Sequence, residues 1–345
     1  MKTDKALILH IGRSKSGTSS LQQYLATHRP ELAAKGICYP KTGARRGYGH
    51  HELADACRKL APSRQQLRDF RAAFEREIEP FDTIIVSSEG FQRIAWARNL
   101  RFLFRRPAPT PFDVALRLAM PFQAGNSYRV KTICYLREYL DYACSSYTQN
   151  VQNSNQKGTL VEYCASNFRR PLSRFVDLWR RFSDETLFLA YDRHKLVDQD
   201  IVADFFDRID VPMPSLSSPS DANPSISGNL LAFKLLLNRN KLHSPSHYAT
   251  FGEIARLEPR YRGRMYVSDA LAKRIRGSLQ NYNTELEQLV GPVELRSFEN
   301  GNRFEPGMWK LDMERFLNHP TLASLKNNQE IYRTSSTEAQ KLLPN

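Results

Sequence analysis

The first thirty residues contain the pattern that most restricts how this chain can fold. Ala6–Ile11 is a short, mostly apolar run of β-prone residues, which is typical of a buried strand. The run ends at Gly12, and a loop of small residues follows as far as Gly17. Apolar residues then recur at helical spacing, and Pro30 predicts that this helix ends near His28. We therefore expect a strand, a tight loop and a helix at the N-terminus.

Three later segments also have the composition of buried strands. Apolar and β-branched residues dominate at 83–88, 130–136 and 186–191. Helical patterns precede and separate these strands, at about 51–60, 63–78, 138–153, 171–183 and 194–209. Because strands alternate with helices, the sequence predicts an α/β fold in which a parallel sheet is flanked by helices.

The C-terminal half of the chain is expected to be mostly helical. A connector rich in Pro and Ser occupies 210–227, and helical patterns without a clear strand follow within 228–289. We expect one domain over residues 1–300, with its core strands within 6–191. Residues 301–345 are polar and irregular in pattern, and they are predicted to form a C-terminal tail.

The net charge limits the classes of partner. The 345 residues include 50 Lys and Arg against 36 Asp and Glu, a formal charge of +14. This charge predicts attraction to an anion such as a phosphate-rich ligand, an acidic glycan, a nucleic acid or the periphery of an anionic membrane.

Other features of the composition indicate a cytoplasmic protein. The sequence has no run of about 18 apolar residues that would predict a transmembrane segment, and its apolar start is too short for a secretory signal. The five cysteines include no Cys-x-x-Cys pair. This cysteine pattern predicts reduced thiols rather than a disulfide framework or a zinc site.

The loop from Gly12 to Gly17 has the features of a phosphate cradle. In such a loop the backbone N–H groups converge, the helix dipole favours an anion, and glycine permits close approach. Lys15 lies inside the loop and places an ammonium group beside the same oxygens. Three hydroxyl residues that follow can cap the helix or bind phosphate oxygens: Thr18, Ser19 and Ser20.

The loop differs from that of nucleotide triphosphatases, which needs Lys directly after the second Gly. Thr18 stands at that position, and the lysine is at 15. Lys15–Ser20 instead resembles the 5′-phosphosulfate loop of sulfotransferases that use 3′-phosphoadenosine 5′-phosphosulfate (PAPS), and the wider stretch resembles their bacterial carbohydrate-type branch. The resemblance implies a fold like that of P-loop nucleotide kinases. It also implies a set of cosubstrate-binding residues: Arg13, Ser14, Lys15, Ser16, Gly17, Thr18, Ser19 and Ser20.

A second match lies at the end of the third expected strand. In the sulfotransferase family, an arginine at this place and a serine eight positions later bind the 3′-phosphate of the nucleotide. Arg137 and Ser145 have that spacing. The chemistry is suitable, because a guanidinium group binds phosphate with two parallel hydrogen bonds and a hydroxyl adds a donor.

The resemblance implies transfer of a sulfuryl group from PAPS to a hydroxyl or amine of an acceptor, for which a saccharide or a glycolipid is expected. Lys15 would neutralise charge on the leaving phosphate, and no metal is expected. Two residues compete for the role of general base. Glu89 follows the strand at 83–88, at the sheet edge where α/β proteins bind ligands. His51, beside His50, opens the expected helix at about 51–60, and histidine titrates in the useful range.

Two other functions stay open from the residues alone. A P-loop kinase that uses ATP and magnesium is disfavoured by Thr18 and by the lack of a clear Asp for the metal after 83–88. A nucleic-acid-binding protein is disfavoured because the basic residues are widely spread and form no recognised module. Accordingly, we expect a nucleotide cosubstrate and a saccharide-like acceptor, and no nucleic acid, as partners. The sequence does not fix the oligomeric state.

Overall fold

A computed structural model describes most of the chain and divides it into two compact units. The described residues are 5–13, 15–45, 47–58, 64–96, 128–153, 156–167, 171–214, 225–244 and 247–343. The first unit comprises Met1–Arg137, Pro171–Ser220 and Glu285–Val293. The second comprises Glu138–Arg170, Asp221–Thr284 and Glu294–Asn345.

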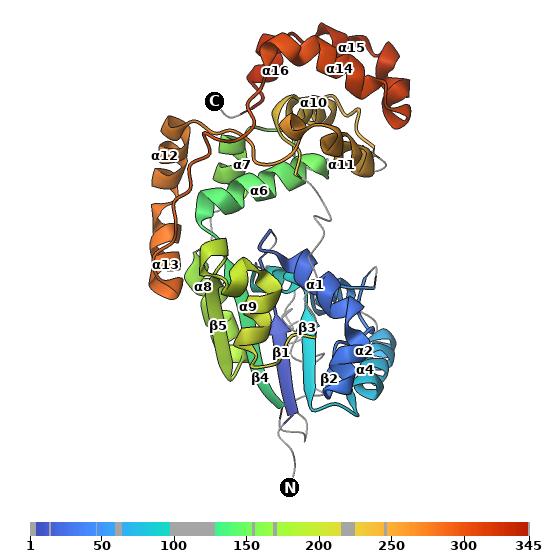
Figure 1. The fold of residues 1–345 in the computed structure, drawn as a ribbon, viewed down its shortest axis with the longest axis vertical. Coiled ribbons are helices and arrows are strands. Elements are labelled where there is room, and N and C mark those ends of the chain that lie inside the picture. Colours follow the sequence, from blue (N-terminus) through green and yellow to red (C-terminus); the bar gives the residue numbers. More distant parts are fainter. Residues whose placement is uncertain are drawn as a thin grey trace, which may run out of the picture. The chain divides into compact units, whose positions relative to one another are not determined.

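The first unit is built on a five-stranded parallel sheet (Figure 1). Its strands are β1 (Lys5–His10), β2 (Ile37–Cys38), β3 (Thr83–Ser87), β4 (Tyr128–Leu136) and β5 (Glu185–Ala190). They lie in the order β2-β3-β1-β4-β5. The four strands expected from the sequence are confirmed, and β2 is an additional short edge strand. The expected α/β class, with a parallel sheet flanked by helices, is therefore confirmed.

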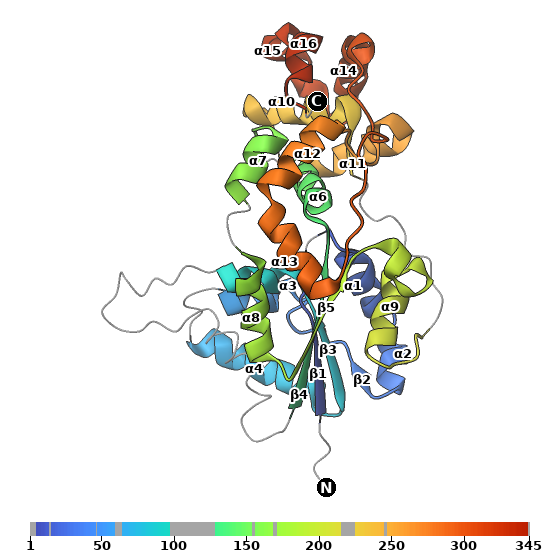
Figure 2. The ribbon, with the colours of Figure 1, turned by 90° about the vertical axis from the view of Figure 1, so that its left-hand side faces the viewer.

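Helices cover both faces of this sheet. They are α1 (Thr18–Thr27), α2 (Arg29–Ala34), α3 (His51–Arg58), α4 (Arg64–Ile78), α8 (Leu172–Phe182) and α9 (Ile201–Arg208). Figure 2 shows α1, α2 and α9 on one side of the sheet and α4 and α8 on the other. Leu21, Leu25 and Phe205 from the first group pack against Ile8 and Tyr135 of the strands.

Two helix boundaries differ from the sequence pattern for identifiable reasons. The helix expected over 194–209 begins only at Ile201, because Asp200 caps it by accepting hydrogen bonds from the N–H groups of Val202 and Ala203. Pro30, expected to follow the end of the first helix, lies in the first turn of α2. Proline is well tolerated there, since the N–H that it lacks has no partner within the helix.

The second unit is built mainly from helices. They are α6 (Tyr139–Gln152), α7 (Leu160–Asn167), α10 (Gly228–Arg239), α11 (His247–Leu257), α12 (Asp269–Ser278), α14 (Trp309–Leu317), α15 (Gln329–Arg333) and α16 (Ser336–Gln340). The boundary between the units falls within α13 (Gln280–Val290). The central helix is α10, in which every residue from Gly228 to Asn238 is buried. Among the described residues, no helix has the length and apolar character that crossing a membrane requires.

The segment 301–345 does not form the irregular tail that the sequence predicts. It contains α14, α15 and α16, and Trp309, Met313 and Phe316 are buried in the core of the second unit. These residues follow one another at helical spacing, so that one face of α14 is apolar. The tail prediction was wrong because the surrounding polar residues are the exposed face of packed helices.

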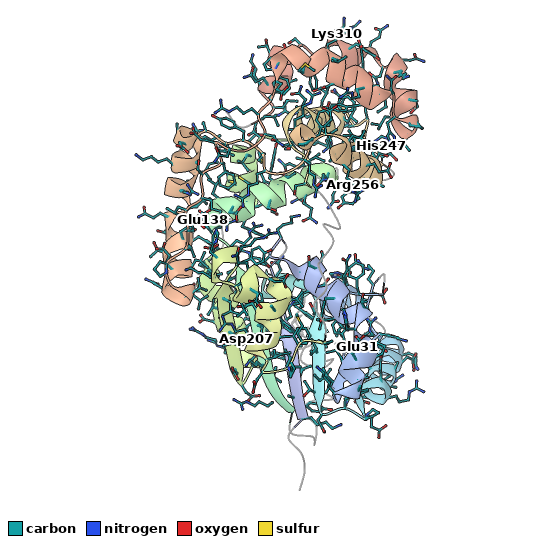
Figure 3. The ribbon with its side chains drawn as sticks, viewed as in Figure 1. Glu31, Glu138, Asp207, His247, Arg256 and Lys310 are labelled. Carbon is teal, nitrogen blue, oxygen red and sulfur yellow. The ribbon has the colours of Figure 1, made fainter. Side chains whose placement is uncertain are left out.

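Two ion pairs with a buried carboxylate lie at the starts of α14 and α6 in this unit. Asp312, which is fully buried on α14, accepts hydrogen bonds from both terminal nitrogens of Arg260, at 3.2 and 2.7 Å. At the start of α6, the Glu138 carboxylate caps the helix through the N–H of Asp141 and pairs with Arg276 at 3.3 Å (Figure 3 labels Glu138). Removal of one partner would leave a charge without compensation, which is costly in a buried place.

Lys234 is an unusual member of the second core. Its side chain is fully buried on α10, where Nζ donates a hydrogen bond to Asn238 Oδ1 at 2.9 Å and lies 5.3 Å from the centre of the Phe251 ring. Burial disfavours the ammonium form and lowers the pKa of Lys234 from 10.5 to about 8. The folded chain therefore holds this charge at a cost at neutral pH.

We predict that Lys234→Met stabilises the protein at pH 7 by about 2 kcal/mol, because it removes the cost of burying the charge. Unfolded lysine keeps its proton up to about pH 10.5, whereas folded Lys234 loses it near pH 8. The wild-type protein should thus gain stability as the pH rises through this window, and the advantage of the variant should shrink. Urea denaturation at pH 7 and pH 9.5 measures both effects. Exposed Lys273→Met is the control; equal shifts in the two variants would contradict the prediction.

Candidate functional site

The strand order of the first unit reverses at β1. The chain leaves β1 toward β2 and β3 and later returns on the opposite side as β4. In α/β sheets, ligands bind beyond the carboxyl ends of the strands where the order reverses in this way. The loop from Ile11 to Gly17 follows β1, Ser88 and Glu89 follow β3, and Arg137 follows β4. The sequence-predicted site residues of this unit therefore belong to one edge of the sheet.

Internal hydrogen bonds shape the loop. The backbone N–H of Ser16 donates to the carbonyl of Arg13 at 3.2 Å, and the Ser16 hydroxyl donates to the same oxygen. The Thr18 hydroxyl reaches this carbonyl at 3.5 Å. Lys15 and Gly17 have positive φ angles of 72° and 73°. Turns with left-handed residues gather successive N–H groups into a concave surface that binds anions.

Both glycines of the loop are required by their surroundings. A Cβ atom on Gly12 would lie 2.7 Å from Cγ2 of Thr18 and 2.9 Å from Nε2 of His10. Gly17 combines its positive φ with close packing, because a Cβ there would lie 3.0 Å from the ring of Tyr191. A larger residue at either position would push the loop away from the sheet.

Arg137 contacts the loop directly. Its Nη1 donates a hydrogen bond to the carbonyl oxygen of Lys15 at 2.6 Å, and its guanidinium carbon lies 5.1 Å from the centre of the Tyr191 ring. The two motifs that the sequence places 122 residues apart therefore meet at one place. Tyr191, which follows β5, supports both the arginine and Gly17.

The site has an excess of positive charge. Burial lowers the pKa of Lys15, and the positive charge of Arg137 lowers it further, whereas the carboxylate of Glu89 acts in the opposite direction. Two cations and one anion thus interact at the loop. A bound anion would relieve the repulsion between the two cations.

The two candidates for the general base lie side by side. Glu89 Oε2 accepts a hydrogen bond from Gln22 Nε2 at 3.1 Å and lies 3.9 Å from His51 Nδ1. The same nitrogen of His51 lies 3.0 Å from the hydroxyl oxygen of Ser88. Sequence analysis did not find Gln22. The sequence signal for Gln22 is its position on α1 one turn beyond Thr18. Residues one turn apart lie on the same face of a helix, so Gln22 shares the face of Thr18.

His50 has a structural role that separates it from His51. It is fully buried, its Nε2 lies 2.9 Å from the carbonyl of Pro40, and its Nδ1 accepts from the N–H of Ser87 at 3.1 Å. Burial lowers the pKa of His50 to about 4, so the ring is neutral at physiological pH. Both nitrogens are occupied, which leaves His51 as the histidine that can act on a ligand.

The remaining predicted residues have different positions. Ser19 is exposed and Ser20 half-buried in the first turns of α1. Ser14 lies outside the described residues. Ser145 is half-buried on α6 and belongs to the second unit. Its expected cooperation with Arg137 in binding a 3′-phosphate stays a prediction.

No family model, curated protein or solved structure matches this chain. The functional interpretation therefore rests on the sequence motifs, the residues of the site and their geometry.

We predict that Gly17→Ala removes anion binding at the loop, whereas Gly36→Ala does not. Both glycines have similar positive φ angles, 73° and 75°, so each variant pays a similar backbone strain of about 1 kcal/mol. A Cβ at Gly36 meets nothing within 4 Å, whereas one at Gly17 contacts Tyr191 and Ile201. Urea denaturation measures the strain, and calorimetric titration with inorganic pyrophosphate measures binding. Equal loss of binding in the two variants would contradict the prediction, because anion binding would then not depend on the packing of Gly17 against Tyr191 and Ile201.

Proposed function

We propose that this protein transfers a sulfuryl group from PAPS to a hydroxyl or amine of an acceptor. One observation carries the proposal: Arg137 donates a hydrogen bond to the carbonyl of Lys15, so the lysine loop and the arginine of the second motif form one cationic site. PAPS has an anionic group at each end of its ribose. A loop for the 5′-phosphosulfate and a nearby guanidinium group for the 3′-phosphate suit this molecule.

The proposed step is an in-line displacement at sulfur. The acceptor oxygen or nitrogen forms a bond to sulfur while the bond from sulfur to the bridging oxygen of the 5′-phosphate breaks. The bridging oxygen keeps the electron pair, and 3′-phosphoadenosine 5′-phosphate (PAP) leaves. The ammonium of Lys15 and the N–H groups of the loop stabilise this charge as it develops. Positioning and charge stabilisation supply the catalysis, so that the step needs no covalent enzyme intermediate.

Glu89 is the proposed base. Gln22 and His51 are both near its Oε2 oxygen, whereas Oε1 has no hydrogen-bond partner in the described part of the chain. A carboxylate held through one oxygen presents the other to the proton of an acceptor hydroxyl. His51 lies beside the same Oε2 oxygen, with its Nδ1 3.9 Å from it and 3.0 Å from the Ser88 hydroxyl oxygen. A saccharide or glycolipid is the proposed acceptor on the basis of the sequence resemblance.

We predict that PAP binds to the wild-type protein without a metal ion and that Arg137→Ala weakens this binding at least tenfold, because it removes a charge-assisted contact to phosphate. Arg129→Ala is the control, since Arg129 lies near the opposite end of β4 and its side chain is 70% exposed. Isothermal calorimetry measures both. Tighter binding of ATP with magnesium would favour a kinase, and salt-sensitive binding of RNA in place of PAP would favour a nucleic-acid partner.

We predict that Glu89→Gln lowers kcat for sulfuryl transfer about a hundredfold or more with little change in the KM for PAPS, because the amide cannot accept the proton. His51→Gln should lower kcat less, since it removes a supporting contact. Glu79→Gln, on the exposed surface beyond α4, serves as the control. A screen of saccharide acceptors with radiolabelled PAPS provides the assay. Full activity in Glu89→Gln would exclude this residue as the base.

A further inference from the structure

The second unit contains a pocket of about 370 Å³ beside α10. Its walls are formed by the start of α10, by the segments 265–266 and 302–304, and by Gln340 and Leu343 at the C-terminal end. Figures 1 and 2 show α16, which ends at Gln340, next to α10. The volume is at the lower end of the range for small-molecule pockets, about 300–1,000 Å³. All the residues that line this pocket belong to the second unit, whereas the phosphate loop belongs to the first.

Asn302 holds one wall of the pocket in a fixed shape. Its backbone N–H donates to the carbonyl of Arg264 at 2.9 Å, and its carbonyl accepts from the N–H of Tyr266 at 3.2 Å. Its side-chain Nδ2 lies 2.8 to 2.9 Å from three acceptors, which are the hydroxyl of Ser227 and two backbone carbonyls. The two segments of the wall are therefore tied together, and the N–H groups of this amide are already used.

Three other polar side chains of the pocket are available to a ligand. The guanidinium carbon of Arg303 lies 4.2 Å from the centre of the Tyr266 ring, and Arg303 has no carboxylate partner in the described part of the chain. Stacking on a ring leaves the N–H groups at the edge of a guanidinium free to bind an anion. The Tyr266 hydroxyl and the Gln340 amide likewise have no hydrogen-bond partner among the described residues.

Most of the remaining lining is apolar. Leu231 and Met265 are buried, and Phe304 and Leu343 are partly buried against the same core. Aromatic rings and a methionine sulfur pack well against a flat aromatic body. A saccharide carries a hydroxyl on most of its ring carbons, and three available polar side chains are too few to pair them all. Because a hydroxyl without a partner is costly once it leaves water, the pocket favours an apolar ring over a sugar.

We propose that this pocket binds a small aromatic carboxylate, with the carboxylate on the guanidinium of Arg303 and the ring against Phe304 and Met265. A guanidinium group binds a planar carboxylate through two parallel hydrogen bonds. Gln340 and Tyr266 are the partners for a polar substituent on the ring. The site is independent of the proposed sulfuryl transfer, because it uses no residue of the phosphate loop.

Benzoate is the probe for this site, and benzamide, which has nearly the same shape without the charge, is the comparison ligand. We expect the wild-type protein to bind benzoate about tenfold more tightly than benzamide, because only benzoate makes the charge-assisted contact. Arg303→Ala should weaken the binding of benzoate about tenfold and leave that of benzamide unchanged, so that the two ligands bind equally. Ligand-observed NMR titrations of the full chain measure these affinities.

Two further variants test the position of the site. Arg264→Ala is the matched control, because Arg264 is an exposed arginine two residues before Tyr266 and does not line the pocket. It should leave the affinity for benzoate unchanged. Gln340→Trp places a larger side chain in the pocket from the end of α16, and it should abolish the binding of both ligands. Thermal unfolding shows whether each variant is folded.

Several results would overturn the proposal. They are no binding of benzoate by the wild type, equal binding of benzoate and benzamide, and unchanged binding of benzoate in Arg303→Ala. Tighter binding of glucuronate than of benzoate would show a saccharide site instead. Loss of benzoate binding in Arg137→Ala but not in Arg303→Ala would place the anion at the phosphate loop. Failure of PAP to bind would exclude sulfuryl transfer and leave the benzoate experiment unaffected.

Discussion

The contact between Arg137 and the carbonyl of Lys15 joins the ends of two neighbouring strands at the candidate site. Because this carbonyl is held, Lys15 keeps a left-handed conformation and its side chain stays near Glu89. The positive charges of the site are thereby concentrated above the end of β1, where the strand order reverses. Without that contact, Lys15 and Arg137 would not be held at one place.

In the second unit, by contrast, the buried charged side chains named above have partners within the unit. Arg260 is paired with buried Asp312, Glu138 with Arg276, and Lys234 is bonded to Asn238 inside the core. These groups are satisfied within the unit, and their contribution is to hold helices in place. The first unit instead keeps two interacting cations at its loop. The net charge of +14 is thus a property of the whole chain, whereas the repulsion between Lys15 and Arg137 is local to the loop.

The sequence predicts those parts of the molecule whose signal is local. The strands, the loop and the first helix follow from short apolar runs, glycines and helical spacing. Gln22 and His10 escaped prediction because their partners, Glu89 and Ser87, are 67 and 77 residues away along the chain. The helix α14 was missed although Trp309, Met313 and Phe316 recur at helical spacing, because the segment around it is strongly polar. Strand β2 has two residues, too few to show the apolar run or the alternation of apolar and polar residues that predicts a strand.

Ser87 ends β3 and Ser88 follows it directly, and the two serines contact different neighbours. Ser87 contacts His10 and His50 in the interior, whereas Ser88 contacts His51 next to the carboxylate. Because successive side chains of a strand alternate between its two faces, an insertion or deletion of one residue in β3 would exchange these neighbours. Substitutions at 51 and 88 therefore change the surroundings of Glu89 alone, while positions 10, 50 and 87 are tied to one another by hydrogen bonds.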